Sequence, residues 1–401
     1  MPQYFVSTTG NPLFTATGHN LEKFRCNACK KTFKAKPPTG VNPKERFTSE
    51  AKASAVTLRY LFGMPSIRIS GIRISGIQKL MGVPISGSTL FDLSELAVNA
   101  LYPVYQYLRV AVASSTKVLQ DDSPAKILSH LNGAEGERKT TRTTAVVGYT
   151  EFGKIHLFKT GEQTAGSYMN DLMQERDPDA QPLLRMADAL SANNRREDFI
   201  EVKCLVHARR QFYDIREMFQ KDCAIILEGF SKIYGQEKAC DELELDAHSR
   251  KRVHARFSIP LMHQIKDHCQ ALLDSKDVEP VDPLGKACRY FLNHFDGLIQ
   301  FGSHAGCPLD NNECERAIKK SIRHRKNSLF YKTDFGALVG DIVMSVGFTA
   351  LEHGLDPHRY FTELIKNQSL VFKNPIPWLP WNFSDHRKEL VQVSEEKAQA
   401  A

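Results

Sequence analysis

The residues of this sequence best suited to chemistry lie between positions 309 and 331, which read "LDNNECERAIKKSIRHRKNSLFY". Glu315 stands near the start of this segment, among acids and amides that favour the beginning of a helix. Capping needs only one such residue, so a carboxylate here could also bind a metal ion beside a polyanion. The cations that follow within eleven positions suit DNA phosphates, although a solvated helix face explains them almost as well: Arg316, Lys319, Lys320, Arg323, Arg325 and Lys326.

Two more acids follow apolar segments that we interpret as strands. Asp121 ends the strand candidate "KVLQ", and Asp188 ends the candidate "PLLRMAD". Phosphoryl transfer to DNA often uses two divalent cations about 3.5–4 Å apart, which oxygen ligands hold. Asp121, Asp188 and Glu315 therefore form a candidate catalytic site for two Mg²⁺ or Mn²⁺ ions, although a single acid at such a position is usually a cap or a solvated charge. The alternative acids are Asp122 in place of Asp121, and Asp177 or Asp179 in place of Asp188.

The elements that must position these acids follow an α/β pattern. Residues 143–161 alternate between apolar and polar side chains around a turn and predict a hairpin, and "AGSYMNDLMQ" predicts a helix. The strands "PLLRMAD" and "FIEVKCLV" and a helix near His207 follow. This order is that of an RNase H-like (retroviral integrase-type) catalytic core, although other α/β folds share it. We expect this core to carry a mostly helical insertion and helical flanking segments.

The chain is therefore expected to divide into six segments. Residues 1–45 look irregular and contain a partial zinc-ribbon-like C-x-x-C, and residues 46–115 form a helical, candidate DNA-binding region. Residues 116–206 and 301–370 make up the two parts of the core, separated by the helical insertion at 207–300. A Pro/Trp tail and a disordered C-terminus occupy residues 371–401.

Composition narrows the class of protein without fixing its function. The 401 residues are 42% hydrophobic and 25% charged, which is typical of globular proteins. We find no apolar run near the roughly 18 residues that span a membrane and no secretory signal, so no membrane partner is expected. Nine cysteines, an odd number, favour a reducing cytoplasm over a disulfide framework. The net charge of +7 is compatible with nucleic acid but does not establish it.

Cys26 and Cys29, in "FRCNACKKTF", have the spacing of one zinc-ribbon knuckle. No second cysteine pair is near, because the next cysteine is Cys204, and His19 is the one nearby candidate ligand. A Zn²⁺ site is therefore incomplete on this sequence. A remnant half-site or plain reduced thiols remain alternatives.

The segment "DNNECERAIKKSIRHRKNSLF" resembles the motif D-N-N-x-x-E-R-A-I-R…R-K-N-x-L-F of the insertion sequence 66 family of DDE transposases. Downstream, "FGALVGDIVMSVGFTALEHGLDPHRYF" is similar to that family's G-A…S…T-A…G-x-x-P-x-x-Y segment. "CLVHARRQF" resembles its C-x-x-H-x-R-R-x-F, and "WLPWNF" its terminal L-P-W-N. The four matches occur in order and cover most of residues 120–383.

This resemblance implies specific roles for the candidate residues. Glu315 corresponds to the family's catalytic glutamate, and Asp121 and Asp188 fall at its two aspartate motifs, D-E-T-P and D-G-Y. Both motifs are altered, because Asp122, Ser123 and Ala189 replace a Glu, a Thr and a Gly. Asn311 and Asn312 are expected to orient Glu315. His207, Arg209 and Arg210 match the family pattern and join the six cations as predicted DNA contacts.

The resemblance also implies a reaction and partners. Such a transposase lets water attack the ends of its element, after which the freed 3′ hydroxyl attacks target DNA. Expected partners are double-stranded DNA (element ends and target), further copies of the chain on DNA, and accessory proteins of the same element, in the nucleoid of a bacterial cytoplasm. We interpret the chain as shortened at its N-terminus, and two acidic motifs are altered, so an inactive DNA-binding remnant is the alternative. A metal-dependent repair nuclease is a weaker one.

Overall fold

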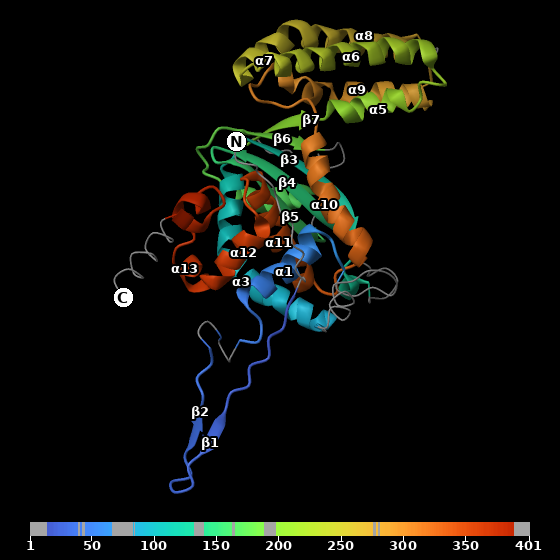
Figure 1. Cartoon of the computed structure of the whole chain (residues 1–401). Helices are drawn as coiled ribbons and strands as arrows, with labels where there is room; N and C mark the ends of the chain where they lie inside the picture. Colours follow the sequence, from blue (N-terminus) through green and yellow to red (C-terminus); the bar gives the residue numbers. More distant parts are fainter. Residues whose placement is uncertain are drawn as a thin grey trace, which may run out of the picture. The chain divides into compact units, whose positions relative to one another are not determined.

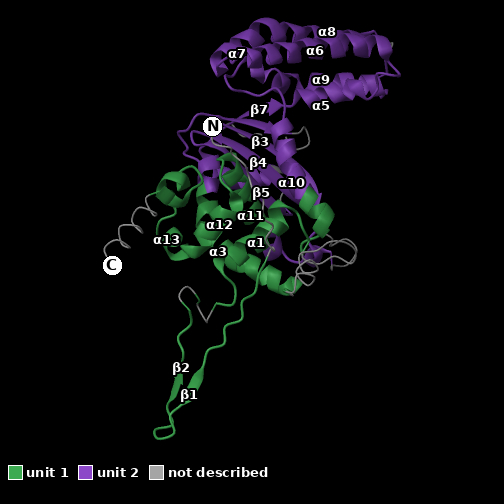
Figure 2. Cartoon of the chain, in the orientation of Figure 1, with its two compact units in different colours: residues 1–107, 323–331, 338–401 green, residues 108–322, 332–337 purple. Residues whose placement is uncertain are grey.

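The computed structural model describes residues 14–38, 41, 45–65, 83, 85–131, 140–162, 165–187, 198–275, 278–279 and 281–388. The chain divides into two compact units (Figure 2). Unit 1 contains residues 1–107, 323–331 and 338–401, and unit 2 contains residues 108–322 and 332–337.

A five-stranded mixed sheet forms the centre of unit 2, in the order β5-β4-β3-β6-β7 (Figure 1). β4 runs antiparallel to β3 and β5, whereas β6 runs parallel to β3 and β7. The predicted hairpin is confirmed, and Gly153 (φ 114°) supplies the backbone conformation that its turn requires. The strands are β3 (Lys117–Ala125), β4 (Thr141–Thr150), β5 (Gly153–Gly161), β6 (Leu183–Ala187) and β7 (Phe199–Lys203).

β3 is longer than its apolar residues suggested, so the prediction that a strand ends at Asp121 is wrong. Pairing with β6 stops at Leu119, but β4 continues to pair with β3 as far as Ala125. Asp121 therefore lies inside β3, two residues beyond its last partner on β6. The length of β3 was underestimated because polar residues can remain part of a strand when one neighbouring strand, here β4, supplies their backbone hydrogen bonds.

Register assigns the residues of β3 to two faces of the sheet. Side chains alternate along a strand, so Asp121 shares a face with Lys117, and Asp122 lies on the opposite face with Val118. On that second face, Gly148 lies opposite Val118, and a Cβ at Gly148 would come within 2.9 Å of Val112. Helix α3 (Gly87–Ala113), which contains Val112, therefore packs closely on the face away from Asp121.

Helices fill the stretch that the sequence predicted to be helical. Rings of α5, α6 and α9 form part of its core, with Phe291 in edge contact with Phe212 and Phe230. α9 also packs on β7, because a Cβ at Gly297 would lie 2.7 Å from the Lys203 side chain. These elements are α5 (Leu205–Tyr213), α6 (Gln220–Glu242), α7 (Ala247–Val253), α8 (Ile259–Asp274) and α9 (Pro283–Leu298), and they follow α4 (Ala165–Met173). Their assignment as an insertion stays a prediction.

Most of the remaining helices lie in the sequence ranges of unit 1, and α10 and α11 contain residues of both units. They are α1 (Ser49–Val56), α10 (Asn312–Ser328), α11 (Asp334–Glu352), α12 (Pro357–Lys366) and α13 (Gln368–Lys373). Among the described residues, α11 is the helix whose length and composition would let it cross a membrane. Its apolar window is 78% buried within the protein, as in the core helix of a globular fold. Of residues 386–401, which the sequence predicted to be disordered, 386–388 are helical, and 389–401 lie outside the described residues.

The sequence suggested that residues 1–45 are irregular, but the structure shows a hairpin in this segment. β1 (Lys23–Arg25) and β2 (Thr32–Lys34) form a short antiparallel hairpin. The Cys26 amide donates to the Lys31 carbonyl, and the Lys30 amide donates back to the Cys26 carbonyl. Lys30 adopts a positive φ of 60° to close the turn. Strands of three exposed residues carry too little apolar pattern to be recognised from sequence.

His324 of α10 is buried in unit 1 between two tyrosine rings. Its ring centroid lies 5.2 Å from that of Tyr60 and 5.3 Å from that of Tyr331, and both pairs are stacked. Burial lowers the pKa of His324 from 6.5 to about 3, and the nearby Arg59 guanidinium contributes to the same effect. The imidazole is therefore neutral in the folded protein at neutral pH.

We expect the protein to lose stability as the pH falls from 6.5 toward 3. The unfolded chain binds a proton at His324 near pH 6.5, but the folded protein does so only near pH 3. The stabilisation is complete above the unfolded pKa and is lost below it, by up to about 1.4 kcal/mol per pH unit. In urea unfolding measured between pH 7 and pH 4, His324→Phe should show a shallower dependence. The exposed His248 supplies the control, His248→Phe, and an unchanged slope in His324→Phe would contradict the assignment.

Candidate functional site

The beginning of α10 is fixed to two other elements of unit 2. The Asn311 side-chain amide donates to the Gln120 carbonyl of β3 at 2.9 Å. The Asn311 backbone amide donates to the Cys204 sulfur at 3.3 Å, and the Leu205 amide donates to the Leu309 carbonyl. Asn311 is fully buried, as is Cys204 immediately before α5. These bonds determine where the first turn of α10 lies relative to the sheet and α5.

Glu315 lies one turn beyond Asn311, and His207 lies one turn beyond Cys204. The His207 Nε2 and Glu315 Oε1 atoms are 3.9 Å apart, and each side chain is about one quarter exposed or less (24% and 21%). Glu315 Oε1 and His207 Nδ1 are both buried without a hydrogen-bond partner. A carboxylate oxygen in that state has a vacant acceptor position for an additional ligand. The spacing C-x-x-H was visible in the sequence, but its position opposite Glu315 was not.

The carboxylates of β3 are close to the same turn of α10. The Cys314 thiol donates to the carbonyl of Ala145, which is paired with Asp121. Burial raises the pKa of this thiol well above its usual value, and surrounding carboxylates add to the effect. In order of decreasing contribution these are Asp121, Glu313, Asp122 and Glu315. Acids from β3 and α10 therefore converge around one buried cysteine.

Of the two adjacent aspartates, Asp121 lies on the face that α10 contacts. Glu313 of α10 accepts a hydrogen bond from Tyr149, which is paired with Lys117 and shares the face of Asp121. Asp122 points to the other face, where its Oδ1 accepts a hydrogen bond from Thr144 at 2.6 Å. Asp121 therefore shares a sheet face with Tyr149, which α10 contacts, whereas Asp122 does not.

Glu313 has a different environment from Glu315. Besides Tyr149, it binds Lys154 of β5, whose Nζ lies 2.5 Å from its Oε1. Lys117 lies over the Tyr149 ring at 4.0 Å, and its Nζ donates to the Gly306 carbonyl. Burial lowers the pKa of Lys117, partly offset by nearby acidic groups including Glu313. Glu313 is thus held in a cluster with Tyr149, Lys117 and Lys154 that sequence reasoning missed, because its partners come from three different strands.

The other predicted residues differ in how much the structure says of them. β6 ends at Ala187, and the predicted ligand Asp188 lies outside the described residues. Asp177 and Asp179 are exposed in the connection after α4, where Asp177 accepts a hydrogen bond from the Asp179 amide. Within α10, the exposed cations recur at helical spacing, and none makes an ion pair with a described residue: Arg316, Lys319, Arg323 and Lys326. Lys320, Arg325, Arg209 and Asn312 are partly buried, and Arg210 is exposed.

A cluster in the helical region of unit 2 has the residue types of a metal site, but its side chains already bind one another. Among the described residues, Glu237, Cys240 and His254 are the one group of three such side chains close enough to share an ion. His254 already interacts with Glu237 at 2.7 Å and with Ser258 at 2.9 Å. Arg250 binds the same glutamate at 2.7 Å. A positive guanidinium on this carboxylate opposes cation binding, so we interpret the cluster as a structural network.

The hairpin around Cys26 and Cys29 provides two thiol ligands. The pKa of the Cys26 thiol is lowered, first by a hydrogen bond from the Cys29 backbone and then by one from the Cys29 side chain. In the described residues no His, Asp or Glu lies near enough to both cysteines to complete a group of three. The residues present therefore do not fit a complete zinc site.

Removing the Asn311 side chain should destabilise unit 2. In Asn311→Ala the buried Gln120 carbonyl loses its donor, which costs about 1–3 kcal/mol in free energy of unfolding. Urea unfolding of the full chain would measure this difference. The control is Gln300→Ala, which removes an exposed hydrogen bond from the Gln300 side-chain amide to the Asp296 carbonyl. It should change the free energy of unfolding by less than about 0.5 kcal/mol. Equal effects of the two variants would contradict the role assigned to Asn311.

Comparison with known proteins gives the family of this chain. Residues 44–338 match the model of the family described as "Transposase IS66 family". The chain is similar to two uncharacterized proteins of Sinorhizobium fredii, y4jD and y4hP. It is 24% identical to y4jD over 381 residues, covering 90% of this chain and 71% of the relative. It is 23% identical to y4hP over 401 residues, covering 90% and 67%. Because the family model spans most of the sequence and includes both β3 and the start of α10, this chain belongs to the IS66 family of transposases.

Proposed function

We propose that this protein is a DNA transposase that cleaves and joins strands by a DDE mechanism, with Asp121, Asp188 and Glu315 as its catalytic acids. Family membership supports a role in transposition and DNA binding. The observation that carries the finer proposal is Glu315, whose buried Oε1 has no hydrogen-bond partner and whose charge, like that of Asp121, acts on the buried Cys314. A solvated charge or a helix cap would not leave that atom buried without a hydrogen bond.

The sheet supports an RNase H-like core as the scaffold of this site. Three antiparallel strands, β5, β4 and β3, continue into two parallel strands, β6 and β7. Asp121 lies on the central strand, and β6 beside it ends one residue before Asp188. This topology supports the proposal, because acids on adjacent rigid elements are what paired metal ions need.

The donor set fits Mg²⁺ or Mn²⁺, because both ions prefer carboxylate oxygens. Asp121, Asp188 and Glu315 would hold two such ions, which activate the attacking oxygen and stabilise the leaving one. The chain's own residues hold this set in place. Asn311 and Cys204 fix the turn that carries Glu315, and His207 limits the movement of its carboxylate. The exposed cations of α10 bind DNA phosphates near the acids.

The decisive variant is Glu315→Gln, assayed on duplex DNA that carries the ends of the element and Mg²⁺. Strand cleavage should fall by more than about 100-fold, since changes to mere supporting partners of metal ligands already cost 10–100-fold. DNA binding should persist. The matched control is Glu313→Gln, which makes the same change two residues away on the same helix and should retain cleavage.

Two results would contradict this proposal. Cleavage by Glu315→Gln at the rate of the wild type would remove Glu315 from the chemistry. Binding without any cleavage by the wild type would favour the alternative, a catalytically inactive DNA-binding remnant of a transposase.

His207 should support metal binding through Glu315, in addition to its predicted contact with DNA. We expect His207→Ala to weaken Mn²⁺ binding by about 10–100-fold, because Glu315 loses the neighbour that limits its orientation. Isothermal titration of Mn²⁺ into the DNA-free protein measures this without relying on activity. His268→Ala removes a histidine that pairs with Asp222 in α6 and should leave Mn²⁺ affinity unchanged. Unchanged affinity in His207→Ala would exclude the supporting role.

A further inference from the structure

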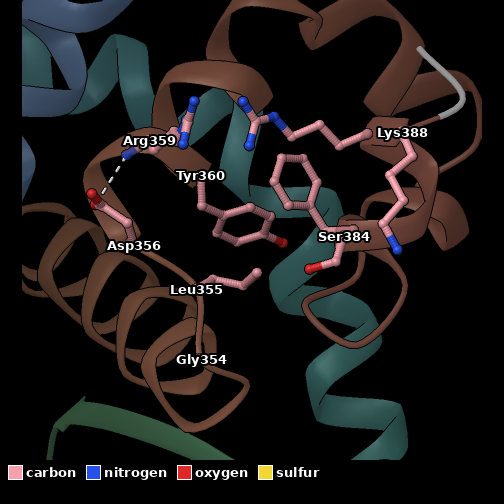
Figure 3. A pocket seen from close by; sticks show the side chains of 9 residues that line it. Gly354, Leu355, Asp356, Arg359, Tyr360, Ser384 and Lys388 are labelled. Carbon is pink, nitrogen blue, oxygen red and sulfur yellow. Dashed lines mark hydrogen bonds between the residues drawn. The ribbon is translucent and has the colours of Figure 1, made fainter. Parts of the chain in front are cut away.

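A hollow lined by cations lies in the C-terminal part of unit 1, with a cavity volume of about 700 Å³. It lies between the start of α12 and the helical residues 383–388. Figure 3 shows Arg359 on one side, Ser384 and Lys388 on the other, and the Tyr360 ring between them. Arg387 also lines it. None of these residues belongs to the site around Glu315.

The base of the hollow is held firmly by aromatic packing. Tyr360 is fully buried, and its hydroxyl donates to the Trp378 carbonyl at 2.6 Å. The Tyr360 ring meets Phe383 edge to face at 4.9 Å, and Trp378 packs on both Phe383 and His386. A close-packed base of this kind keeps its shape, so the hollow is a fixed feature of the surface.

The charges around the hollow are not balanced within the described residues. Asp356 is the acidic residue in the lining of the hollow. Its carboxylate already accepts hydrogen bonds from the backbone amides of His358 and Arg359 at the start of α12. Lys388 pairs with Asp385 at 2.7 Å. The guanidinium groups of Arg359 and Arg387 make no ion pair with any described residue. Two guanidinium groups beside one hollow, neither with an ion pair among the described residues, repel each other, and an anion between them would relieve that repulsion.

We propose that this hollow binds a phosphodiester of the DNA backbone through Arg359 and Arg387. The inference rests on the proposed function, because it takes DNA as the substrate. The planar guanidinium presents paired N–H donors that match two phosphate oxygens. The Ser384 hydroxyl adds a further donor, and the partly exposed side chain of Leu355 offers an apolar contact for the sugar that follows the phosphate. Such a contact positions DNA and reads no base.

The test measures DNA affinity against salt concentration for the full chain, in EDTA so that no strand is cut. The double variant Arg359→Ala/Arg387→Ala should reduce the slope of log Kd against log salt by about 0.9, which is the contribution of one phosphate contact. The control is Lys366→Ala/Lys373→Ala, which removes two exposed charges elsewhere in unit 1. It should change the slope by less than half as much.

Each other outcome overturns the proposal. An unchanged slope in the arginine variant, with an unfolding midpoint like that of the wild type, means that the hollow does not contact DNA. An equal loss in the lysine control means that only net charge matters. If inorganic phosphate at constant ionic strength stabilises the wild type but not the variant, and the DNA slope is unchanged, the hollow binds a small anion instead. Because no cleavage is measured, failure here is distinct from failure of the Glu315 experiment.

Discussion

The hydrogen bond from the Asn311 side chain to the Gln120 carbonyl is the contact on which the candidate site depends. It lies just past the point where β3 loses β6 as a partner, so the side chain immediately before α10 binds β3 where no strand pairs with it on that side. The same residue binds Cys204 through its backbone amide. One buried asparagine thus connects the central strand, α5 and α10, and it fixes where the turn that carries Glu315 begins relative to β3.

The junction at Asn311 explains why acids come first along α10 and cations follow. The first turn of α10 lies near the acids of β3, and its own two acids have different environments. Glu313 accepts a hydrogen bond from Tyr149 and forms an ion pair with Lys154, whereas Glu315 Oε1 is buried without a hydrogen-bond partner. Cations follow on the exposed face of the same helix. Acids suit the positive end of a helix and cations its later turns, so the local electrostatics and the proposed binding of DNA favour the same order.

The helical region between β7 and α10 is stabilised by contacts of its own. Its rings pack against each other around Phe291, and its buried histidine, His254, is paired with Glu237 and Ser258. These polar groups satisfy each other and leave no vacancy for a ligand. This region contributes to the site by positioning residues, since α5 begins at the junction with Asn311 and carries His207.

The sequence by itself determined the family and the order of strands and helices, and it singled out Glu315 as a candidate, because local periodicity and short motifs are properties of neighbouring residues. It could not determine the length of β3 or which of Asp121 and Asp122 shares a sheet face with Tyr149, because pairing with β4 decides both. Nor did it show that Glu313 is held by Tyr149 and Lys154 while Glu315 meets His207. Those contacts join residues more than one hundred positions apart, and only the folded backbone brings such residues within the range where hydrogen bonds and charges act.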